Sequence, residues 1–260
     1  MTDNMCNEEI TKATIELGKD VAKDILHPTS KSIGDNLGLL VDGVMGWLGY
    51  WGQKQAIKRE IYLIEYKKEI EEAVRRRKEE NLIDPQIRIV GPAIEASKFY
   101  IEDKDFREMF AELIASSCDK ETEQLVHPSF PEIIKQLSSM DAKLLQLFVQ
   151  KTTFPCIKLL SENSDNTVTP YRHLIVDLNE CSHSFNQKDE LYFTQSIDNL
   201  MRLGILRLNS EVIQLSYDYA KFKEHWYYKA AEKECDGNIK IKRYRLELTE
   251  LGENFKRCCL

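Results

Sequence analysis

The sequence lacks the short patterns that identify most enzyme classes. None of the GxSxG, HExxH or Walker-type phosphate-loop patterns occurs in its 260 residues, and no paired-carboxylate signature is present. It also lacks a Cys-x-x-Cys pair, which zinc and redox sites commonly use. We therefore expect a protein that is not an enzyme and that uses no cofactor or metal.

A secretory leader is also missing. Met1–Asn7 is polar and is followed by two glutamates, with no basic start and no apolar run. The seven cysteines are an odd number, which favours free thiols in a reducing compartment. The Cys-Cys-Leu ending is not a prenylation signal, because Arg257 occupies the position that requires cysteine. We expect a cytoplasmic protein, with at most a peripheral contact to a membrane.

Basic charge is not in excess anywhere at the scale of a domain. The net charge is −7, and residues 138–260 carry 17 basic and 17 acidic side chains, so the negative charge belongs to residues 1–137. Nucleic-acid-binding domains are usually basic. Nucleic acid is therefore a weakly supported partner, and a protein partner or a homo-oligomer is favoured. No small-molecule substrate is evident.

Residues 33–52, IGDNLGLLVDGVMGWLGYWG, contain six of the eleven glycines and two of the three tryptophans. Their Leu, Ile and Val residues contribute about −4 kcal/mol to membrane insertion, whereas Asp35 and Asp42 cost roughly 5 to 7 kcal/mol, so a membrane span is disfavoured. Dense glycines favour close helix packing, within the chain or between subunits. Membrane-surface contact is the alternative. The candidate contact residues are Gly38, Gly43, Gly46, Trp47, Gly49 and Trp51.

Residues 53–81 predict a long charged helix with interleaved Lys, Arg and Glu. Arg75–Lys78 is expected to be a solvated helix end, with phosphate or anionic lipid as the alternative contact. Its apolar stripe is expected to contain Ile57, Ile61, Ile64, Ile70 and Val74.

Two shorter helices are expected next. Asp84-Pro85 predicts a helix start, with a break or kink at Gly91-Pro92, and Asp103 predicts a second start. The inward residues are expected to be Ile87, Val90, Ile94 and Phe99 in the first helix and Phe106, Met109, Phe110, Leu113 and Ile114 in the second.

The stretch 124–145 joins the two halves of the chain. Ser129, followed by Pro131 and Glu132, predicts an N-cap, and Ser138–Asp141 repeats this start signal. A catalytic role for His127 would need a nucleophile and an orienting acid, and the sequence contains none of the catalytic signatures, so we interpret His127 as a structural hydrogen-bonding residue. The predicted structural junction consists of His127, Pro128, Ser129 and Phe130.

The second half predicts a mixture of helices and strands. Helices are expected over Met140–Gln150, Asp189–Leu203 and Asp218–Glu234, with Gly204 as a left-handed cap. A loop follows the first helix, and Tyr171–Leu178 is a short mixed element. Ile205–Leu208 is expected to pair with Val212–Leu215 around Asn209-Ser210, Asn238–Leu248 alternates as a strand, and Thr249 caps a last helix. This order is typical of a winged helix with an inserted helix in its wing.

Four basic residues of the predicted wing are candidate nucleic-acid contacts: Lys240, Lys242, Arg243 and Arg245. The helix before Gly204 argues against groove binding, because its exposed residues include Asp189, Glu190 and Asp198. A protein-interaction module is therefore the favoured interpretation, and a DNA-binding transcriptional regulator is the alternative. His173, His183 and Cys181 lack a convincing fourth ligand for zinc.

The fold class expected is mostly α, α+β: a helical domain over residues 1–137 and a winged-helix-like domain over residues 138–260. A longer-range pattern adds a family resemblance. It comprises Asp84-Pro85, Phe106 to Ser116, His127-Pro128-Ser129-Phe130 with Glu132 to Leu137, the late LxxLGIL of Leu200–Leu206 and the LTELGxxF of Leu248–Phe255. Together these resemble the Abi-alpha family of bacterial abortive-infection proteins.

The resemblance implies a role in phage defence and supplies no catalytic residues. The expected function is a non-enzymatic anti-phage protein that acts through protein or membrane contacts. The open alternatives are a transcriptional regulator and a membrane-disrupting protein that uses residues 33–52.

Overall fold

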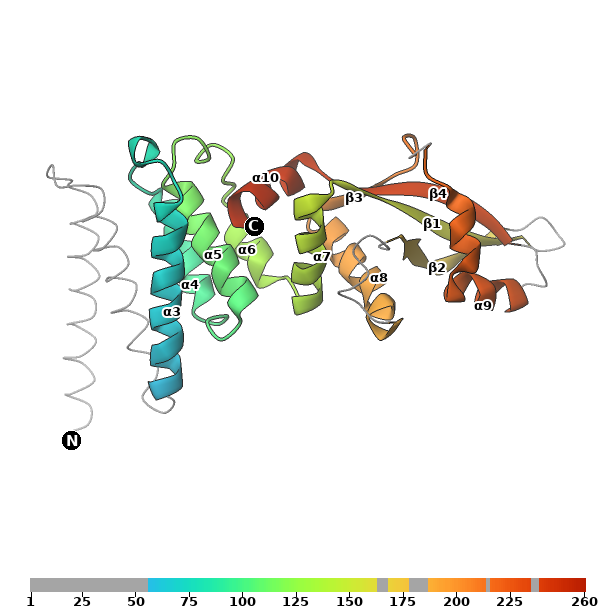
Figure 1. The fold of residues 1–260 in the computed structure, drawn as a ribbon, viewed down its shortest axis with the longest axis horizontal. Coiled ribbons are helices and arrows are strands. Elements are labelled where there is room, and N and C mark those ends of the chain that lie inside the picture. Colours follow the sequence, from blue (N-terminus) through green and yellow to red (C-terminus); the bar gives the residue numbers. More distant parts are fainter. Residues whose placement is uncertain (1–55, 163–167, 178–186, 214–215, 235–238) are drawn as a thin grey trace, which may run out of the picture. The chain divides into compact units, whose positions relative to one another are not determined.

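The computed structural model describes residues 56–162, 168–177, 187–213, 216–234 and 239–260 (Figure 1). It is mostly helical with one four-stranded antiparallel sheet, so the fold is α+β. The chain divides into two compact units, of which the second is Gln136–Arg257. The first unit contains the chain up to Lys135 together with Cys258–Leu260.

The first unit is helical throughout its described part. Its elements are α3 (Ala56–Arg75), the short 3-10 helix η1 (Glu79–Asn81), α4 (Ile87–Ser97), α5 (Lys104–Ser117) and α6 (Phe130–Lys135). Helix α5 packs against α3, α4 and α6 and supplies the core. The residues predicted to face inward on α5 are confirmed as buried: Phe106, Met109, Phe110, Leu113 and Ile114. The N-cap at Asp103 is also confirmed, since its side chain accepts a hydrogen bond from the backbone N–H of Asp105.

The inward face of α3 differs from the predicted stripe. Ile70 and Val74 are buried as expected, but Ile64 is 60% exposed, and Tyr66 and Ala73 are fully buried in its place. A helix packed on one neighbour presents residues spaced three and four apart, and the set 66, 70, 73 and 74 satisfies that spacing. The predicted stripe followed the hydrophobicity of the isoleucines, whereas the helical spacing decides which side chains are buried.

Helix α4 begins later than predicted and passes through its proline. It starts at Ile87 after the cap residue Gln86, so Asp84 is not the cap, and Pro92 lies inside the helix with no break. Ala93, which is fully buried directly after Pro92, packs the helix into the core despite the missing N–H. The expectation that Ile87 and Phe99 face inward is wrong, because they are 51% and 70% exposed.

The second unit combines three α-helices and part of a fourth with the sheet. The helices are α7 (Ser139–Gln150), α8 (Gln187–Arg202) and α9 (Trp226–Glu234), and α10 (Glu250–Cys259) begins here. The Ser138–Asp141 start signal of α7 is confirmed as a complete capping box. Gly204, with φ 76°, is confirmed as the left-handed residue after α8. The hydroxyl of Thr249 accepts the backbone N–H of Gly252 at 2.9 Å, which confirms the predicted cap of the last helix.

The sheet has the strand order β2-β1-β4-β3, with every neighbouring pair antiparallel. Its strands are β1 (Thr153–Glu162), β2 (Val168–Val176), β3 (Leu206–Asn209) and β4 (Ile239–Leu248). Strand β4 confirms the alternating segment of the sequence. The loop predicted after α7 is wrong, since β1 and β2 form a long hairpin there. Strand β3 pairs with β4, and its predicted partner Val212–Leu215 lies partly outside the described residues.

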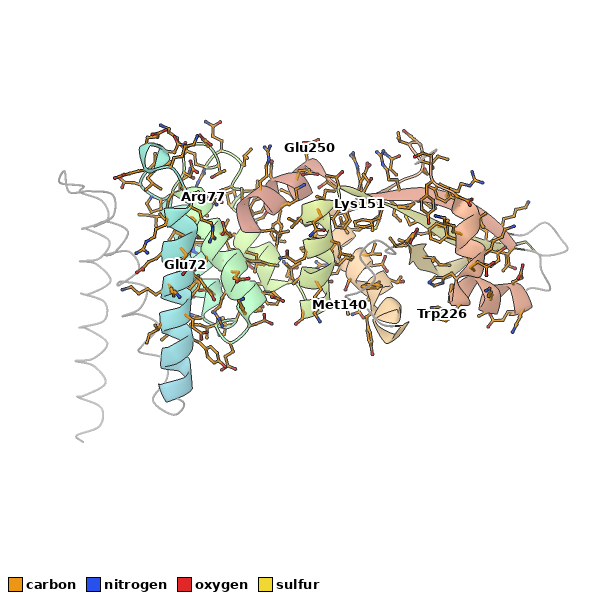
Figure 2. All side chains as sticks on the ribbon, in the orientation of Figure 1. Glu72, Arg77, Met140, Lys151, Trp226 and Glu250 are labelled. Carbon is orange, nitrogen blue, oxygen red and sulfur yellow. The ribbon has the colours of Figure 1, made fainter. Side chains whose placement is uncertain are left out.

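The two faces of the sheet have different coverings. On one face, Ile157, Leu159 and Ile175 pack against the 3-10 helix η3 (Tyr219–Glu224) and α9. The predicted helix over 218–234 is therefore two segments, separated at His225. On the opposite face, Phe154 meets Phe148 of α7 edge-on, with ring centroids 4.9 Å apart. Lys151, between α7 and β1 (Figure 2), lies over the same Phe154 ring.

Candidate functional site

The basic residues of β4 do not form one edge. Side chains alternate along a strand, so Lys240 and Lys242 lie on one face of the sheet and Arg243 and Arg245 on the other. The alternation predicted for this strand already separates the two pairs, but the sequence does not show which face of the sheet is covered. The predicted set of four therefore divides into two pairs with different surroundings.

The lysine pair shares its face with two further residues. Lys158 of β1 is the direct cross-strand partner of Lys242. Tyr244, two residues after Lys242, lies on the same face, and its ring centroid is 5.3 Å from the Lys242 Nζ and 5.8 Å from the Lys158 Nζ. We call the residues Lys158, Lys240, Lys242 and Tyr244 the lysine face. Lys158 has no sequence signal of its own, because only the strand pairing brings it to this position.

The arginine pair lies on the face covered by η3 and α9, where each side chain has a partner. Arg243 lies over the ring of Tyr219, with its guanidinium carbon 5.3 Å from the centroid. Arg245 forms an ion pair with Glu247 of the same strand. Arg207 and Asn209 of β3 donate to the same carboxylate at 2.8 and 3.1 Å. This face therefore contains an internal polar cluster.

Glu247 is the centre of that cluster. The residue is only 5% exposed. Burial alone would raise its pKa, but hydrogen bonds from Asn209, Arg207 and Arg245 outweigh burial, and the pKa of Glu247 is lowered. The carboxylate is thus held in its charged form. Its ion pair with Arg245 engages a side chain that the sequence offered as a nucleic-acid contact.

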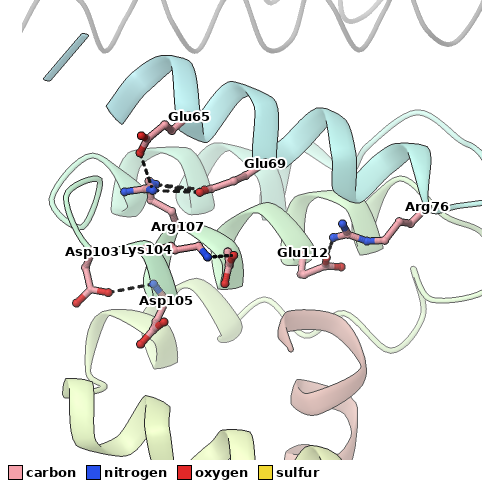
Figure 3. Close-up of polar contacts among 9 residues, drawn as sticks. Glu65, Glu69, Arg76, Asp103, Lys104, Asp105, Arg107 and Glu112 are labelled. Atoms are coloured by element: carbon pink, nitrogen blue, oxygen red, sulfur yellow. Dashed lines mark hydrogen bonds and ion pairs between the residues drawn. The ribbon is translucent and has the colours of Figure 1, made fainter. Parts of the chain in front are cut away.

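In the first unit, charged residues join α3 to α5 (Figure 3). Arg107 of α5 is 5% exposed and donates from Nη2 to Glu65 at 2.9 Å and to Glu69 at 3.1 Å. Burial raises the pKa of Glu69, and its hydrogen bond from Arg107 offsets part of that rise. Arg107 donates to both carboxylate oxygens of Glu69, so this cluster connects the two helices as an internal brace.

The basic run at the end of the same long helix also has carboxylate partners. Arg76 and Arg77 both pair with Glu112 of α5, and the Nη2 of Arg77 donates to the Glu112 carboxylate at 3.0 Å. Arg75 pairs with Glu71 at 3.8 Å, and Lys78 with Glu121 at 3.7 Å. The alternative role in phosphate or lipid contact therefore competes with four existing ion pairs.

The predicted junction before α6 contains a local hydrogen-bond motif. The Nδ1 of His127 lies 2.7 Å from the Ser129 hydroxyl and accepts the Ser129 backbone N–H at 3.2 Å. The backbone oxygens of His127 and Ser129 accept from Phe130 and Ile133 as α6 begins. Phe130 is fully buried, whereas His127 and Pro128 are exposed. All of these contacts lie within the few residues around the start of α6.

The described cysteines are buried free thiols: Cys118, Cys156, Cys258 and Cys259. Burial raises the pKa of Cys118 to about 11 and that of Cys156 to about 12, and it raises the pKa of Cys259 well above its ordinary value. A protonated, enclosed thiol is a poor nucleophile and a poor metal ligand. Across the described ranges no group of three or more His, Cys, Asp or Glu side chains could hold a metal ion.

The glycine- and tryptophan-rich candidate segment lies outside the described residues, as do Gly38, Gly43, Gly46, Trp47, Gly49 and Trp51 individually. His183 and Cys181 also lie outside them. Among the helices that the structure does describe, none combines the length and the apolar character needed to cross a bilayer.

These features define a two-unit α+β protein with an internally braced helical unit and a sheet that has one basic face. Comparison with protein families then gives a definite assignment. The family model described as "Abortive infection alpha" matches residues 58–259. Because the match covers most of the chain, the chain belongs to this family, and the resemblance found in the sequence is confirmed.

Other comparisons add little. No curated protein sequence matches the chain. A solved structure of an uncharacterized protein from the hydrocarbon-degrading marine bacterium Alcanivorax borkumensis SK2 is similar, with 16% sequence identity and a TM-score of 0.35. That similarity covers 52% of this chain and 92% of the other. It carries no argument about function.

Proposed function

We propose that the chain is an anti-phage protein that acts in abortive infection through protein contacts, without catalysing a reaction. The observation that carries the proposal is the family match over residues 58–259. The name of the family gives the context, phage defence. The mechanism is our own inference from the surfaces that the chain presents.

Exposed apolar side chains in the first unit support a protein-contact mechanism. Phe99, two residues after the end of α4, is 70% exposed, and Ile64 of α3 is 60% exposed. Large apolar and aromatic side chains are common anchors in protein interfaces, where their burial supplies much of the binding energy. The ring of Phe99 has the Lys98 ammonium 5.0 Å from its centroid, so an apolar anchor and a charge lie together. We place this action in the cytoplasm, where buried free thiols persist.

We further propose that the second unit is a winged-helix variant used as an interaction module. Supporting this, α8 is followed by the left-handed Gly204, then by β3 and, after the η3–α9 insertion, by β4. Two polar residues of α8 that a groove-binding helix could use, Asn199 and Arg202, are engaged within the unit. Asn199 donates to the Gln136 backbone oxygen at 3.0 Å and to Asp141 at 2.9 Å, and Arg202 donates to the Gln136 side chain at 3.1 Å.

The proposal is tested by plating a broad panel of phages on bacteria that express the chain and on cells with an empty vector. We expect reduced plating of at least one phage. The variant Ile64→Ser/Phe99→Ser should lose that protection while keeping its circular dichroism spectrum and melting temperature. Val149→Ser is the matched control, because Val149 is 49% exposed on α7 and the substitution is chemically similar.

Two results would contradict the proposal. Equal plating on both strains over the whole panel would remove the role in defence. Full protection by the folded Ile64→Ser/Phe99→Ser variant would leave the role in defence intact and would reject contact through the first unit.

A further inference from the structure

We propose that the lysine face of the sheet binds single-stranded nucleic acid, with Tyr244 stacking on a base and the lysines contacting phosphates. This inference does not rest on the role in phage defence, because it concerns binding by the isolated chain. It replaces the four-residue edge predicted from the sequence with a set that lies on a single face: Lys158, Lys240, Lys242 and Tyr244.

The cross-strand pairing of Lys158 with Lys242 is costly unless a negative partner is present. Lys158 and Lys242 are direct cross-strand partners. Side chains in such pairs lie about 5 Å apart at Cβ, and like charges there are destabilising. Lys240 follows on the same face, about 7 Å further along β4. A folded chain with net charge −7 thus concentrates three positive charges on one small surface.

Neutralisation from within the sheet is weak on this face. The neighbouring positions on the same face are Cys156 and Leu160 of β1, Leu174 of β2 and Leu246 of β4, none of which is acidic. Within the described part of the chain, Lys158 and Lys242 have no carboxylate at ion-pair distance, and each has the ring of Tyr244 as its neighbour. Arg245 on the opposite face, by contrast, is paired with Glu247.

The ring of Tyr244, beside Lys158 and Lys242, indicates which kind of polyanion fits this surface best. Surfaces that bind single strands combine cations for the backbone with aromatic rings on which unpaired bases stack, and a sheet face with aromatic residues is one established way to build them. Tyr244 is half-buried, so it is packed on the sheet and still accessible to a ligand. Bases in a duplex are already stacked, and presenting one to Tyr244 costs a few kcal/mol.

The lysines can be redirected to phosphates at small cost. An exposed cation–π contact is worth about 0.5 to 1 kcal/mol. Contact with a phosphate releases a bound counterion from the nucleic acid, and this makes the affinity depend on salt. The ammonium groups of Lys158 and Lys242 therefore form a pair that a phosphate chain can recruit without breaking any stronger bond.

The experiment is fluorescence anisotropy with the full chain and labelled single-stranded DNA and RNA of about 15 nucleotides, long enough for one such site. At about 50 mM monovalent salt we expect saturable binding, with a log–log salt slope of about −2 for three phosphate contacts. Lys158→Gln/Lys242→Gln should reduce the magnitude of that slope by about 1.4. Tyr244→Leu should weaken binding about tenfold with little change in slope, whereas Tyr244→Phe should bind normally.

Lys143→Gln/Lys223→Gln is the matched control. It removes the same charge from the same unit at two exposed residues, Lys143 of α7 and Lys223 of η3. It should leave both slope and affinity close to those of the parent chain. Melting temperatures of all variants separate a loss of binding from a loss of folding.

Three results would overturn the proposal. The first is absence of binding to either oligonucleotide at low salt. The second is an equal effect of the Lys158/Lys242 and Lys143/Lys223 substitutions. The third is equal or tighter binding to duplex DNA or to vesicles of anionic lipid, with Tyr244→Leu unaffected, which would indicate a general polyanion surface. None of these results depends on whether the cells resist phage.

Discussion

The Nε of Arg107 lies 3.3 and 3.2 Å from the two carboxylate oxygens of Glu69, so a single guanidinium binds both and joins α5 to α3 (Figure 3). Arg107 also donates from Nη1 to the backbone oxygen of Ile101 at 2.8 Å. The first unit therefore depends on a buried cation whose removal leaves a half-buried carboxylate without its donor.

Arg107→Met is expected to lower the free energy of unfolding by about 3 kcal/mol, because removing one member of a buried pair leaves the other uncompensated. Urea denaturation followed by circular dichroism measures the loss. Lys104→Met on the same helix is the control, since its pair with Glu108 is exposed and worth about 0.5 kcal/mol. Arg107→Met/Glu69→Leu should recover most of the stability. A double variant no more stable than Arg107→Met would show that the packing of Arg107, and not its charge, is what matters.

Gly252 and Gly91 should respond in opposite directions to alanine. A Cβ at Gly252 would lie 2.2 Å from the backbone oxygen of Ile205, so Gly252→Ala must displace the backbone and should cost about 3 kcal/mol. A Cβ at Gly91 meets nothing within 4 Å, and Gly91→Ala in the middle of α4 should stabilise the chain by about 1 kcal/mol. Thermal melting of the two variants tests both signs, and equal shifts would contradict this explanation.

Ionisation of Glu247 should contribute to the pH dependence of the free energy of unfolding in acid. Its folded-state pKa is below the ordinary value of about 4.3, so the folded chain binds fewer protons than the unfolded chain in acid. The stabilisation is therefore fully present above about pH 4.3 and is lost as the pH falls through the lowered folded-state pKa. Glu247→Gln should be less stable than the parent at neutral pH, and the difference should shrink in acid.

The measurement for Glu247 is the urea midpoint as a function of pH. Glu211→Gln is the control, because Glu211 is an exposed carboxylate in the segment after β3. A constant difference between Glu247→Gln and the parent at all pH values would mean that ionisation of Glu247 does not contribute.

The contribution of the α7 capping box to stability can be measured by comparing alanine substitutions at two adjacent serines. Ser138 accepts the backbone N–H of Asp141 at 3.1 Å, and Asp141 accepts that of Ser138 at 2.7 Å. Ser138→Ala should cost about 1 kcal/mol of unfolding free energy. Ser139→Ala, one residue inside the helix and equally exposed, should be near neutral. We expect Ser138→Ala to melt at a lower temperature than Ser139→Ala. The reverse order would show that the cap is not the source of the stabilisation.

The sequence predicted the local chemistry of the fold well. Turn and cap signals predict the roles of Asp103, Ser138, Gly204 and Thr249, and each of these signals involves residues only a few positions apart. Such signals depend only on the backbone conformation of neighbouring residues, so the sequence contains the information needed to predict them. The family could also be recognised, because its residue pattern extends through both halves.

Long-range pairing was harder to predict. The sequence predicts a loop where β1 lies, because the segment contains Pro155. In the structure β1 lies between β2 and β4, and β4 is far away in the sequence. The lysine face depends on the same pairing, since only the register places Lys158 opposite Lys242. The sequence shows the run KIKRYR and its alternation, but it does not show which of the two faces η3 and α9 cover.

The last three residues of the chain belong to the first unit. Cys258–Leu260 group with residues far earlier in the sequence, and the hydroxyl of Ser116 donates to the Cys258 backbone oxygen at 3.2 Å. The second unit is therefore an insertion between two parts of the first. During synthesis on the ribosome, the first unit can acquire its final contacts only after the whole second unit has emerged, so a prematurely terminated chain lacks part of its amino-terminal core.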